Sequence, residues 1–418
     1  MAQTVVSRPG LSPWRMVVGL GLVSLTVDMV ADGARSVSGP LLAQLGASAL
    51  VVGVVTGAAD AAGLTLRLVS GPLVDRTRRY WGFTIGGYAL TAVSVPLLAL
   101  TPQLGTAGLS VAAALLVVER TGKAVRSPAK TVLLADAAGA VGRGRGFGVH
   151  KTLDQVGAFL GPLVVAGVIA LTGVMWPAFL VLIVPAVVAI VLLVRLRRRV
   201  PDPSLYRPLA VGADEAPAPV AGTAPASRRD VPVTFLLFAV SCALTTFGLV
   251  GFGVISYHLD VAGLVPLAAV PLVYALGMLA GAVAALGSGW AYDRAGAGAL
   301  LAVPVLVAAI PPLALADALP AALAGVVVWG AAVGIQDSTV KALVADLVPT
   351  GRRGTAFGVF AVLQGATTFA GAALAGALYP DRGLLTVVVG AAQALALVLL
   401  VVVLRRQRRV AAQPVPLR

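Results

Sequence analysis

Long apolar stretches recur along the whole chain, and each is about as long as a helix that crosses a membrane. A helix needs about 20 apolar residues to cross the hydrocarbon core of a bilayer. The pattern predicts twelve such spans in two sets of six. They lie near residues 14–44, 48–74, 80–100, 106–136, 146–171 and 174–196, and then near 232–257, 265–291, 297–316, 319–346, 355–378 and 384–404.

Basic residues between the spans predict which side of the membrane each connection faces. Lys or Arg follows every second span, whereas the alternate connections have none apart from Arg382. By the positive-inside rule, both chain ends and the central Pro- and Ala-rich connection are expected in the cytoplasm. The expected parts are an N-terminal six-helix bundle (1–196), a flexible cytoplasmic linker (197–230), a C-terminal six-helix bundle (231–404) and a basic cytoplasmic tail (405–418).

Composition agrees with an all-α polytopic membrane protein. The chain has 418 residues, of which 59% are hydrophobic and only 11% charged, whereas a soluble protein carries about a quarter charged residues. The net charge of +14 would suggest nucleic acid in a soluble domain, but here arginines at the span ends account for it. We therefore expect a monomer whose partners are the lipid bilayer and a small-molecule substrate, without nucleic acid.

The sequence contains no pattern typical of a metal site or of a catalytic triad. No His/Cys cluster has the spacing of a metal site, and no arrangement resembles a catalytic triad, so we expect neither a metal nor an enzyme. No cofactor is expected either. Cys242 stands alone, which excludes an intrachain disulfide, and it is expected to be a buried small side chain.

A stretch of the first half recurs in the second half. VLLADAAGAVGRGRGFGV begins at residue 132, and ALVADLVPTGRRGTAFGV begins at residue 342. Aligned in this way, Asp136 meets Asp346 and Arg143 meets Arg353. The chain therefore consists of two copies of one membrane unit, of which only the first has a heavily charged centre.

Two short loop motifs occupy matching places after the second and eighth spans. They are Gly71-Pro-Leu-Val-Asp75-Arg76-Thr-Arg78-Arg79 and Gly289-Trp-Ala-Tyr-Asp293-Arg294-Ala-Gly296. Both resemble the G-x-L-a-D-R-x-G-R loop signature of the major facilitator superfamily (MFS). Arg78 stands where the family usually has glycine, so a tight turn at this loop is expected to use another residue.

The resemblance implies the MFS fold, with two six-helix bundles that rock about a central site. In the family, this loop holds the cytoplasmic side of the bundles together when the transporter faces outward. Carried onto this chain, the gating residues are Gly71, Asp75, Arg76 and Arg79 with Asp136 as partner, and Asp293, Arg294 and Asp346 in the second half. The alternative is ordinary interfacial charge that only fixes the topology.

The fifth span carries a second motif. Gly157 and Gly161 are four residues apart, a spacing that permits close helix approach, and Pro162 is expected to bend the helix. The segment resembles the first half of the G-x-x-x-G-P-x-x-G-G signature of the family's proton-coupled exporters, with Val165 and Ala166 in place of two glycines. The motif favours export, and generic helix packing is the alternative.

Charged residues lie at membrane depth in the first half. Glu119, Lys123, Arg126 and Lys130 share one face of the fourth span. Such groups are costly in a bilayer unless they face water, a partner or a ligand, so they are functional candidates. The alternative is a set of ion pairs that hold helices in register. The predicted cavity residues are Asp28, Asp32, Arg35, Asp60, Arg67, Lys123, Arg126, Lys130, Asp154, Gln336, Asp337, Lys341 and Gln364.

These patterns lead to a functional hypothesis. We expect a secondary active transporter of a bacterial inner membrane that exports small amphipathic molecules in exchange for protons, driven by the proton gradient. A carboxylate, Asp28 or Asp32, would alternate between a proton and a cationic neighbour as the bundles rock, with substrate near the midplane. Alternatives are an organic-anion or metabolite permease, which the excess of Lys and Arg favours, a lipid translocase and a non-transporting sensor.

Overall fold

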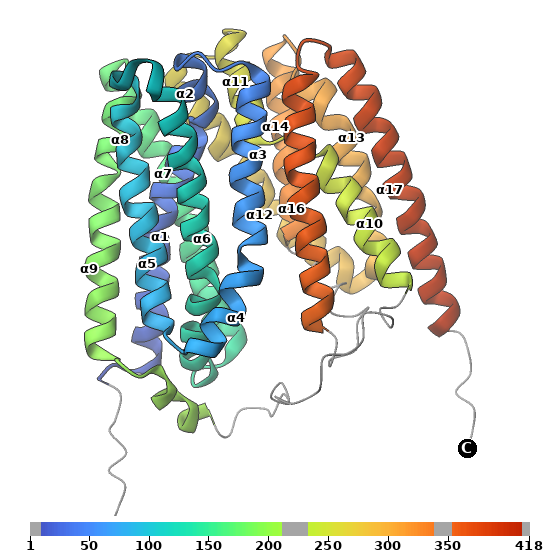
Figure 1. The fold of residues 1–418 in the computed structure, drawn as a ribbon. Helices are drawn as coiled ribbons and strands as arrows, with labels where there is room; N and C mark the ends of the chain where they lie inside the picture. The colour runs from blue at the N-terminus through green and yellow to red at the C-terminus, as the bar shows by residue number, and fades with distance from the viewer. Residues whose placement is uncertain (1–9, 211–232, 338–352, 412–418) are drawn as a thin grey trace, which may run out of the picture. The chain divides into compact units, whose positions relative to one another are not determined.

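The computed structural model describes residues 10–210, 233–337 and 353–411, which form helices joined by short turns without a strand (Figure 1). Within these residues, nine stretches are long and apolar enough to cross a membrane, and Tyr80–Gly139 contains two successive helices. Two further apolar helices are shorter, Gly298–Ala314 and Leu319–Ile335. The all-α polytopic membrane architecture is confirmed.

Internal contacts divide the chain into two compact units. Unit 1 comprises Met1–Arg35 and Thr65–Pro219, and unit 2 comprises Ser36–Leu64 and Val220–Arg418. The helices between residues 36 and 64, which the sequence places in the first bundle, therefore have their contacts with the second half. The bundle and linker boundaries derived from the sequence stay a prediction.

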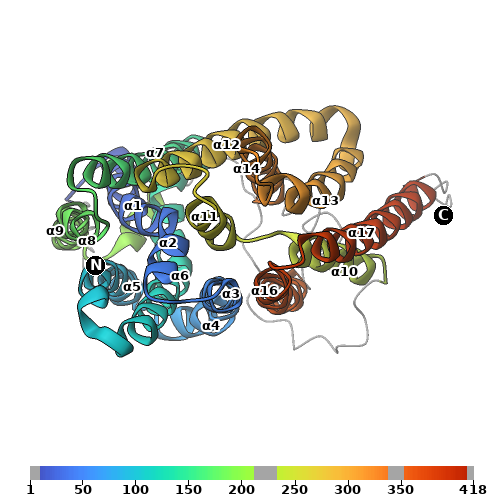
Figure 2. The same cartoon turned by 90° about the horizontal axis from the view of Figure 1, so that it is seen from above.

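Unit 1 is built around one long helix, α6, which packs along α5 and also contacts α4 and α7 (Figure 2). A helix of this length is more than sufficient to cross a bilayer. The elements of unit 1 are α1 (Pro13–Ser36), α4 (Arg67–Thr77), α5 (Tyr80–Leu97), η1 (Leu98–Ala107), α6 (Gly108–Gly139), α7 (Arg143–Thr172), α8 (Trp176–Val181), α9 (Ile183–Arg199) and η2 (Pro203–Ala210).

The apolar core of unit 1 collects one face of α1 against α5, α6 and α9. Met16, Leu20, Val23 and Val27 recur at helical spacing on α1 and are all buried. This face holds α1 in place by burial of apolar side chains. The polar residues of α1 are therefore held at fixed positions relative to α5 and α6.

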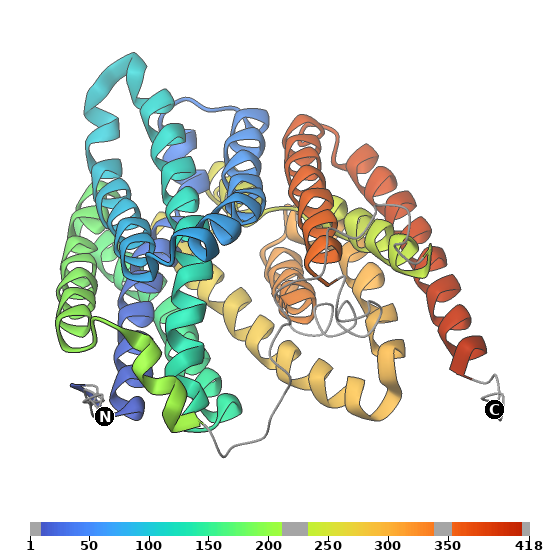
Figure 3. The same ribbon diagram turned by 60° about the horizontal axis from the view of Figure 1, so that its bottom comes forward.

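The short helix η2 is packed against the Arg-rich end of unit 1. Figure 3 shows it running from the end of α9, and it lies against α6. Tyr206 is fully buried, and its hydroxyl donates a hydrogen bond to the carbonyl of Leu11 at 3.0 Å. Burial raises the pKa of Tyr206 to about 12, so the hydroxyl remains a donor at neutral pH. The first residues after α9 are thus attached to the segment that leads into α1.

The turn after α4 is made by Arg78 itself, which corrects the expectation that another residue forms it. Arg78 adopts the left-handed conformation (φ 52, ψ 19), and its N–H closes the last turn of α4 by donating to the carbonyl of Val74 at 2.8 Å. It is the only non-glycine with positive φ in the described part of the chain. Glycine is favoured in this conformation because it has no Cβ to collide with the backbone.

Unit 2 packs α10 against α16 and α17 and pairs α12 with α14 (Figure 2). Its aromatic core joins Phe252, Tyr274 and Trp329, with ring centroids 4.7 Å apart for the first pair. Its elements are α2 (Ser38–Gln44), α3 (Ala49–Thr65), α10 (Val233–Gly248), α11 (Phe252–Val261), η4 (Leu267–Ala269), α12 (Val270–Ala295), η5 (Gly296–Leu301), α13 (Ala302–Ala314), α14 (Leu319–Ile335), α16 (Arg353–Ala377) and α17 (Arg382–Ala411).

Glycines set the closest helix contacts of unit 2. A Cβ on Gly330 or Gly334 of α14 would overlap the carbonyl oxygen of Gly277 or Gly281 on α12. Likewise, a Cβ on Gly39 of α2 would overlap the backbone of α11. Small residues allow this approach, which drives helix association in membranes through van der Waals contact.

The packing of α12 on α14 gives a stability prediction. Replacing Gly330→Ala forces the helices apart and is expected to lower the free energy of unfolding by about 1–3 kcal/mol. Thermal unfolding of the purified protein in detergent measures this change. The matched control is Gly289→Ala on α12, where an added Cβ meets nothing within 4 Å. Equal midpoints for both variants would contradict the assigned role.

The turn after α4 gives a second prediction, of opposite sign. Replacing Arg78→Gly removes the unfavourable left-handed conformation and is expected to stabilise the protein by about 1 kcal/mol. The neighbouring Arg79→Gly serves as control because Arg79 has a negative φ of −85. A gain in both variants would point to loss of charge instead of relief of backbone strain. The same unfolding assay separates the two cases.

Candidate functional site

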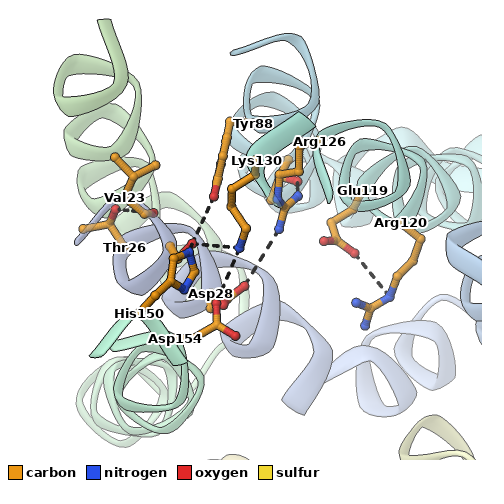
Figure 4. A network of polar contacts seen from close by, with 12 residues as sticks. Val23, Thr26, Asp28, Tyr88, Glu119, Arg120, Arg126, Lys130, His150 and Asp154 are labelled. Carbon is orange, nitrogen blue, oxygen red and sulfur yellow. Dashed lines mark hydrogen bonds and ion pairs between the residues drawn. The ribbon is translucent and has the colours of Figure 1, made fainter. Parts of the chain in front are cut away.

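Buried and half-buried charged side chains from three helices of unit 1 lie close together. Figure 4 shows Asp28 on α1, Arg126 on α6 and Asp154 on α7 around one location. Asp28 is 7% exposed and Arg126 is 3% exposed. We call the set formed by Asp28, Arg126, Lys130 and Asp154 the ionic cluster. An unpaired charge buried in a membrane protein is strongly unfavourable. Each charged group of the ionic cluster is therefore expected to have a partner.

Arg126 is the best-held cation of the ionic cluster. Its Nη2 lies 3.8 Å from Oδ1 of Asp28, and its Nη1 donates a hydrogen bond to the hydroxyl of Thr91 at 2.9 Å. The guanidinium also lies over the ring of Tyr88, 4.8 Å from its centroid. Thr91 and the ring of Tyr88, both on α5, would therefore continue to hold Arg126 if Asp28 lost its charge.

Lys130 joins α6 to both α1 and α7. Its Nζ donates a hydrogen bond to the hydroxyl of Ser24 at 3.0 Å and lies 3.8 Å from Oδ1 of Asp154. The Ser24 hydroxyl is also 3.1 Å from the hydroxyl of Tyr88 and 3.3 Å from Nε2 of His150. A polar network therefore continues from the ionic cluster to α5.

Lys151 and Lys123 extend the ionic cluster in two directions. Asp154 accepts a hydrogen bond from Nζ of Lys151 at 3.0 Å, and Lys151 is two-thirds exposed. Lys123, one turn before Arg126 on α6, is in electrostatic contact with Asp28 and Asp32. The cluster thus extends to an exposed cation on α7 and to a half-buried one on α6.

Glu119 and Arg120 form a separate pair further along α6. Oε2 of Glu119 lies 3.4 Å from Nε of Arg120, and both side chains are buried. The other oxygen of Glu119 has no hydrogen-bond partner among the described residues. An ion pair between sequence neighbours fits the alternative of a structural pair.

Gly157 and Gly161 lie against α1. A Cβ on either glycine would overlap the backbone carbonyl of Leu25 or Met29. Pro162 is buried within α7, which continues to Thr172. The fifth-span motif therefore sets the approach of α7 to the helix that carries Asp28.

The remaining cavity candidates lie elsewhere. Arg35 is on α1 and Arg67 on α4, whereas Asp60 is on α3 in unit 2, because the second predicted span is divided at residue 66. Unit 2 also holds three polar candidates of the second half, which are Gln336 beside an apolar cavity, Asp337, and Gln364, whose amide donates to the hydroxyl of Thr246 at 3.4 Å. Lys341 lies outside the described residues.

The predicted gating residues are placed by the structure but not tested by it. Gly71, Asp75 and Arg76 are on the last turns of α4, with both charged side chains exposed, Arg79 precedes α5, and Asp136 is on α6. In unit 2, Arg294 lies over the ring of Trp290 at 3.7 Å. Asp346 and the side chain of Asp293 lie outside the described residues. The gating role stays a prediction.

Sequence reasoning missed part of the network. His150 is 5% exposed, and its Nε2 lies 3.3 Å from the hydroxyl of Ser24, but it was not among the predicted site residues. Ser24 and Tyr88 carry no charge and were not selected. The spacing of Ser24 one turn before Asp28 is the only signal that could have included it.

The chemistry available here is proton and ion exchange. Carboxylates face several cations in a site largely closed to water, and neutralising one carboxylate releases a cation. No group of three His, Cys, Asp or Glu side chains in the described ranges is placed to hold a metal. In a helical membrane protein, a buried ionic cluster of this kind is typical of sites that carry ions, protons or substrates.

Comparison with known proteins identifies the family. The sequence model of the Major Facilitator Superfamily matches residues 20–372, and the chain belongs to this family of secondary transporters. Proteins of Mycobacterium tuberculosis and Mycobacterium bovis, both described as uncharacterized, are 50% identical over 399 residues, 94% of this chain and 94% of each relative. The resemblance seen in the loop motifs is thereby confirmed.

Solved structures agree on the fold. The nucleoside transporter NupG matches with a TM-score of 0.67 at 12% identity, covering 93% of this chain and 99% of that chain. The peptide transporter POT in complex with sulfate matches with a TM-score of 0.70 at 18% identity, covering 94% of each. Identities this low show a common fold only.

The contact between Asp28 and Arg126 gives a third prediction. In a double-mutant cycle of Asp28→Asn and Arg126→Leu, the two destabilisations are expected to be non-additive by about 1–3 kcal/mol, because each change alone leaves a buried group without its partner. Detergent unfolding provides the four stabilities. The control cycle pairs Arg126→Leu with Asp202→Asn, an exposed carboxylate beside η2, and should be additive. Additivity in both cycles would contradict the pairing.

Proposed function

We propose that this protein is a proton-coupled exporter of small molecules that works by alternating access in a bacterial inner membrane, with both chain ends in the cytoplasm. The observation that carries the proposal is the buried pair of Asp28 and Arg126, 3.8 Å apart. A carboxylate that faces a cation within a membrane bundle is suited to proton coupling, because binding a proton breaks its ion pair and losing the proton restores it.

The geometry supports the following cycle. Ionised Asp28 pairs with Arg126; protonated Asp28 does not, and Arg126 then depends on Thr91 and Tyr88. A proton arriving from outside would neutralise Asp28 and leave the cluster with an additional positive charge. Because proton binding and bundle arrangement change together, each biases the other. Export follows if substrate leaves in the state that accepts the proton.

The fifth-span motif supports the outward direction. Gly157 and Gly161 bring α7 close to α1 and Asp28, so the segment that resembles an exporter signature adjoins the proposed proton site. The family relatives supply no substrate, since the mycobacterial proteins have no described activity. Small amphipathic molecules remain the proposed substrates.

A second candidate, an organic-anion transporter, is favoured by one observation. Four cations lie in or beside the ionic cluster, and they outnumber the three carboxylates there. The cations are Lys123, Arg126, Lys130 and Lys151, and the carboxylates are Asp28, Asp32 and Asp154. Surplus positive charge would attract a carboxylate- or phosphate-bearing substrate. The same cluster could then couple anion movement to protons.

The proposal predicts loss of proton coupling when Asp28 is neutralised. Asp28→Asn is expected to lower proton-driven transport in proteoliposomes by about tenfold or more, because the variant cannot exchange a proton for the ion pair. Exchange of substrate without a gradient should persist. A fluorescent lipophilic cation and a fluorescent carboxylate dye serve as the two probes. Transport of the dye alone would favour the organic-anion candidate.

Two variants set the limits of this experiment. Asp202→Asn removes an exposed carboxylate and should leave the gradient dependence unchanged. Asp32→Asn tests the other carboxylate of α1. Full gradient dependence in both Asp28→Asn and Asp32→Asn would reject proton coupling at α1, whatever the probe.

A further inference from the structure

A second carboxylate lies beside Asp28. Asp154 of α7 and Asp28 of α1 lie next to each other in the ionic cluster, with their side chains at the same place between the two helices (Figure 4). Two ionised carboxylates have only acceptors and repel each other, so neighbouring carboxyl groups are favoured when one of them carries a proton. A carboxylic acid on one residue then donates to a carboxylate oxygen on the other.

We propose that Asp28 and Asp154 hold one proton between them, so that the coupling site is a carboxyl pair bridging α1 and α7. The proposal deepens the proposed function and rests on it. The proton balance is simple: the pair with its proton carries one negative charge, and loss of the proton leaves two carboxylates. Carboxyl pairs that share a proton in this way lose the first and second proton in separate steps.

The backbone keeps the two carboxyl groups together. Leu25 and Met29, which flank Asp28 on α1, are the residues whose carbonyls contact Gly157 and Gly161 of α7. Gly157 is one turn after Asp154. The closest approach of the two helices is therefore made within one turn of both carboxyl groups, and any larger side chain at these glycines would separate them.

Cations lie on both sides of the pair and are only partly engaged. Arg126 is 3.8 Å from Asp28, and Lys130 is 3.8 Å from Asp154, whereas a direct charge-assisted hydrogen bond measures about 2.7–2.9 Å. Closer approach of both cations would compensate two negative charges and expel the proton. Their withdrawal would favour its return.

Other groups around the pair complete its surroundings. They are Asp32 on α1, Lys123 on α6, His150 and Lys151 on α7, and Tyr88 on α5, which lies against Arg126. Lys151 donates a hydrogen bond to Asp154 at 3.0 Å. Lys151 is mostly exposed, so Asp154 is bonded to a side chain that reaches the surface of unit 1. Asp154 is therefore the more exposed member of the pair, and Asp28, beside Arg126, is the more buried member.

Infrared spectroscopy of the purified protein tests the proposal without a substrate. At about pH 7, the wild-type protein should show the C=O stretch of a protonated carboxyl group, which free aspartates no longer give at this pH. Asp28→Asn and Asp154→Asn should each remove this band completely, and the double variant should remove no more. The control Asp202→Asn should retain it. Absence of the band from the wild type, or its survival in either single variant, would overturn the shared proton.

The glycines provide an independent test that leaves both carboxyl groups in place. Gly161→Ala should separate α7 from α1 and reduce the band to roughly half or less of its wild-type intensity. Gly167→Ala on the same helix should leave the band unchanged, because an added Cβ there meets nothing within 4 Å. A full band in Gly161→Ala would show that the helix contact does not hold the pair.

Infrared and transport measurements together distinguish failure of the shared proton from failure of the proposed function. A shared-proton band together with transport that ignores the proton gradient rejects proton coupling and keeps the pair. Gradient-driven transport together with a band that survives Asp154→Asn rejects the pair and leaves Asp28 as a single proton carrier. The two measurements use the same proteins, in detergent and in proteoliposomes.

Discussion

The structure of unit 1 depends on how buried charges are compensated between α1, α6 and α7. Removing an ion from water is so unfavourable that each charged group in the membrane interior must find a partner. Arg126 meets this requirement with Asp28, with the hydroxyl of Thr91 and with the ring of Tyr88. Because the arginine has three partners, loss of one does not leave it without support, and this is the property that a reversible ion pair requires.

Glycines make this compensation geometrically feasible. Side chains such as Asp have short reach, so charged groups on different helices meet only if the backbones approach closely. Gly157 and Gly161 allow α7 to approach α1. Unit 2 uses the same device in Gly330 and Gly334, yet no buried ion pair accompanies the contact among the described residues of α12 and α14. Close packing is thus common to both units, whereas the buried ion pairs described here distinguish unit 1.

The sequence predicted the fold well because hydropathy, basic connections and the internal repeat all act over many residues. It also identified Asp28, Arg126, Lys130 and Asp154 as candidates, since any charge at membrane depth stands out. It did not predict which of them pair, because pairing depends on the rotation and offset of helices, and these are set by packing. The division at residue 66 and the left-handed Arg78 are likewise decided by tertiary context that periodicity does not contain.

The arrangement of charges also explains why the polar neighbours matter. Ser24 receives a hydrogen bond from Lys130 and contacts both Tyr88 and His150, so its hydroxyl connects side chains of α5, α6 and α7. In a medium of low polarity such a network is stable only while its donors and acceptors match. A change of protonation at Asp154 would therefore alter the balance at Lys130 and be felt at Ser24 on α1. Through these contacts, protonation of Asp154 on α7 would change the interaction energy of α7 with both α6 and α1.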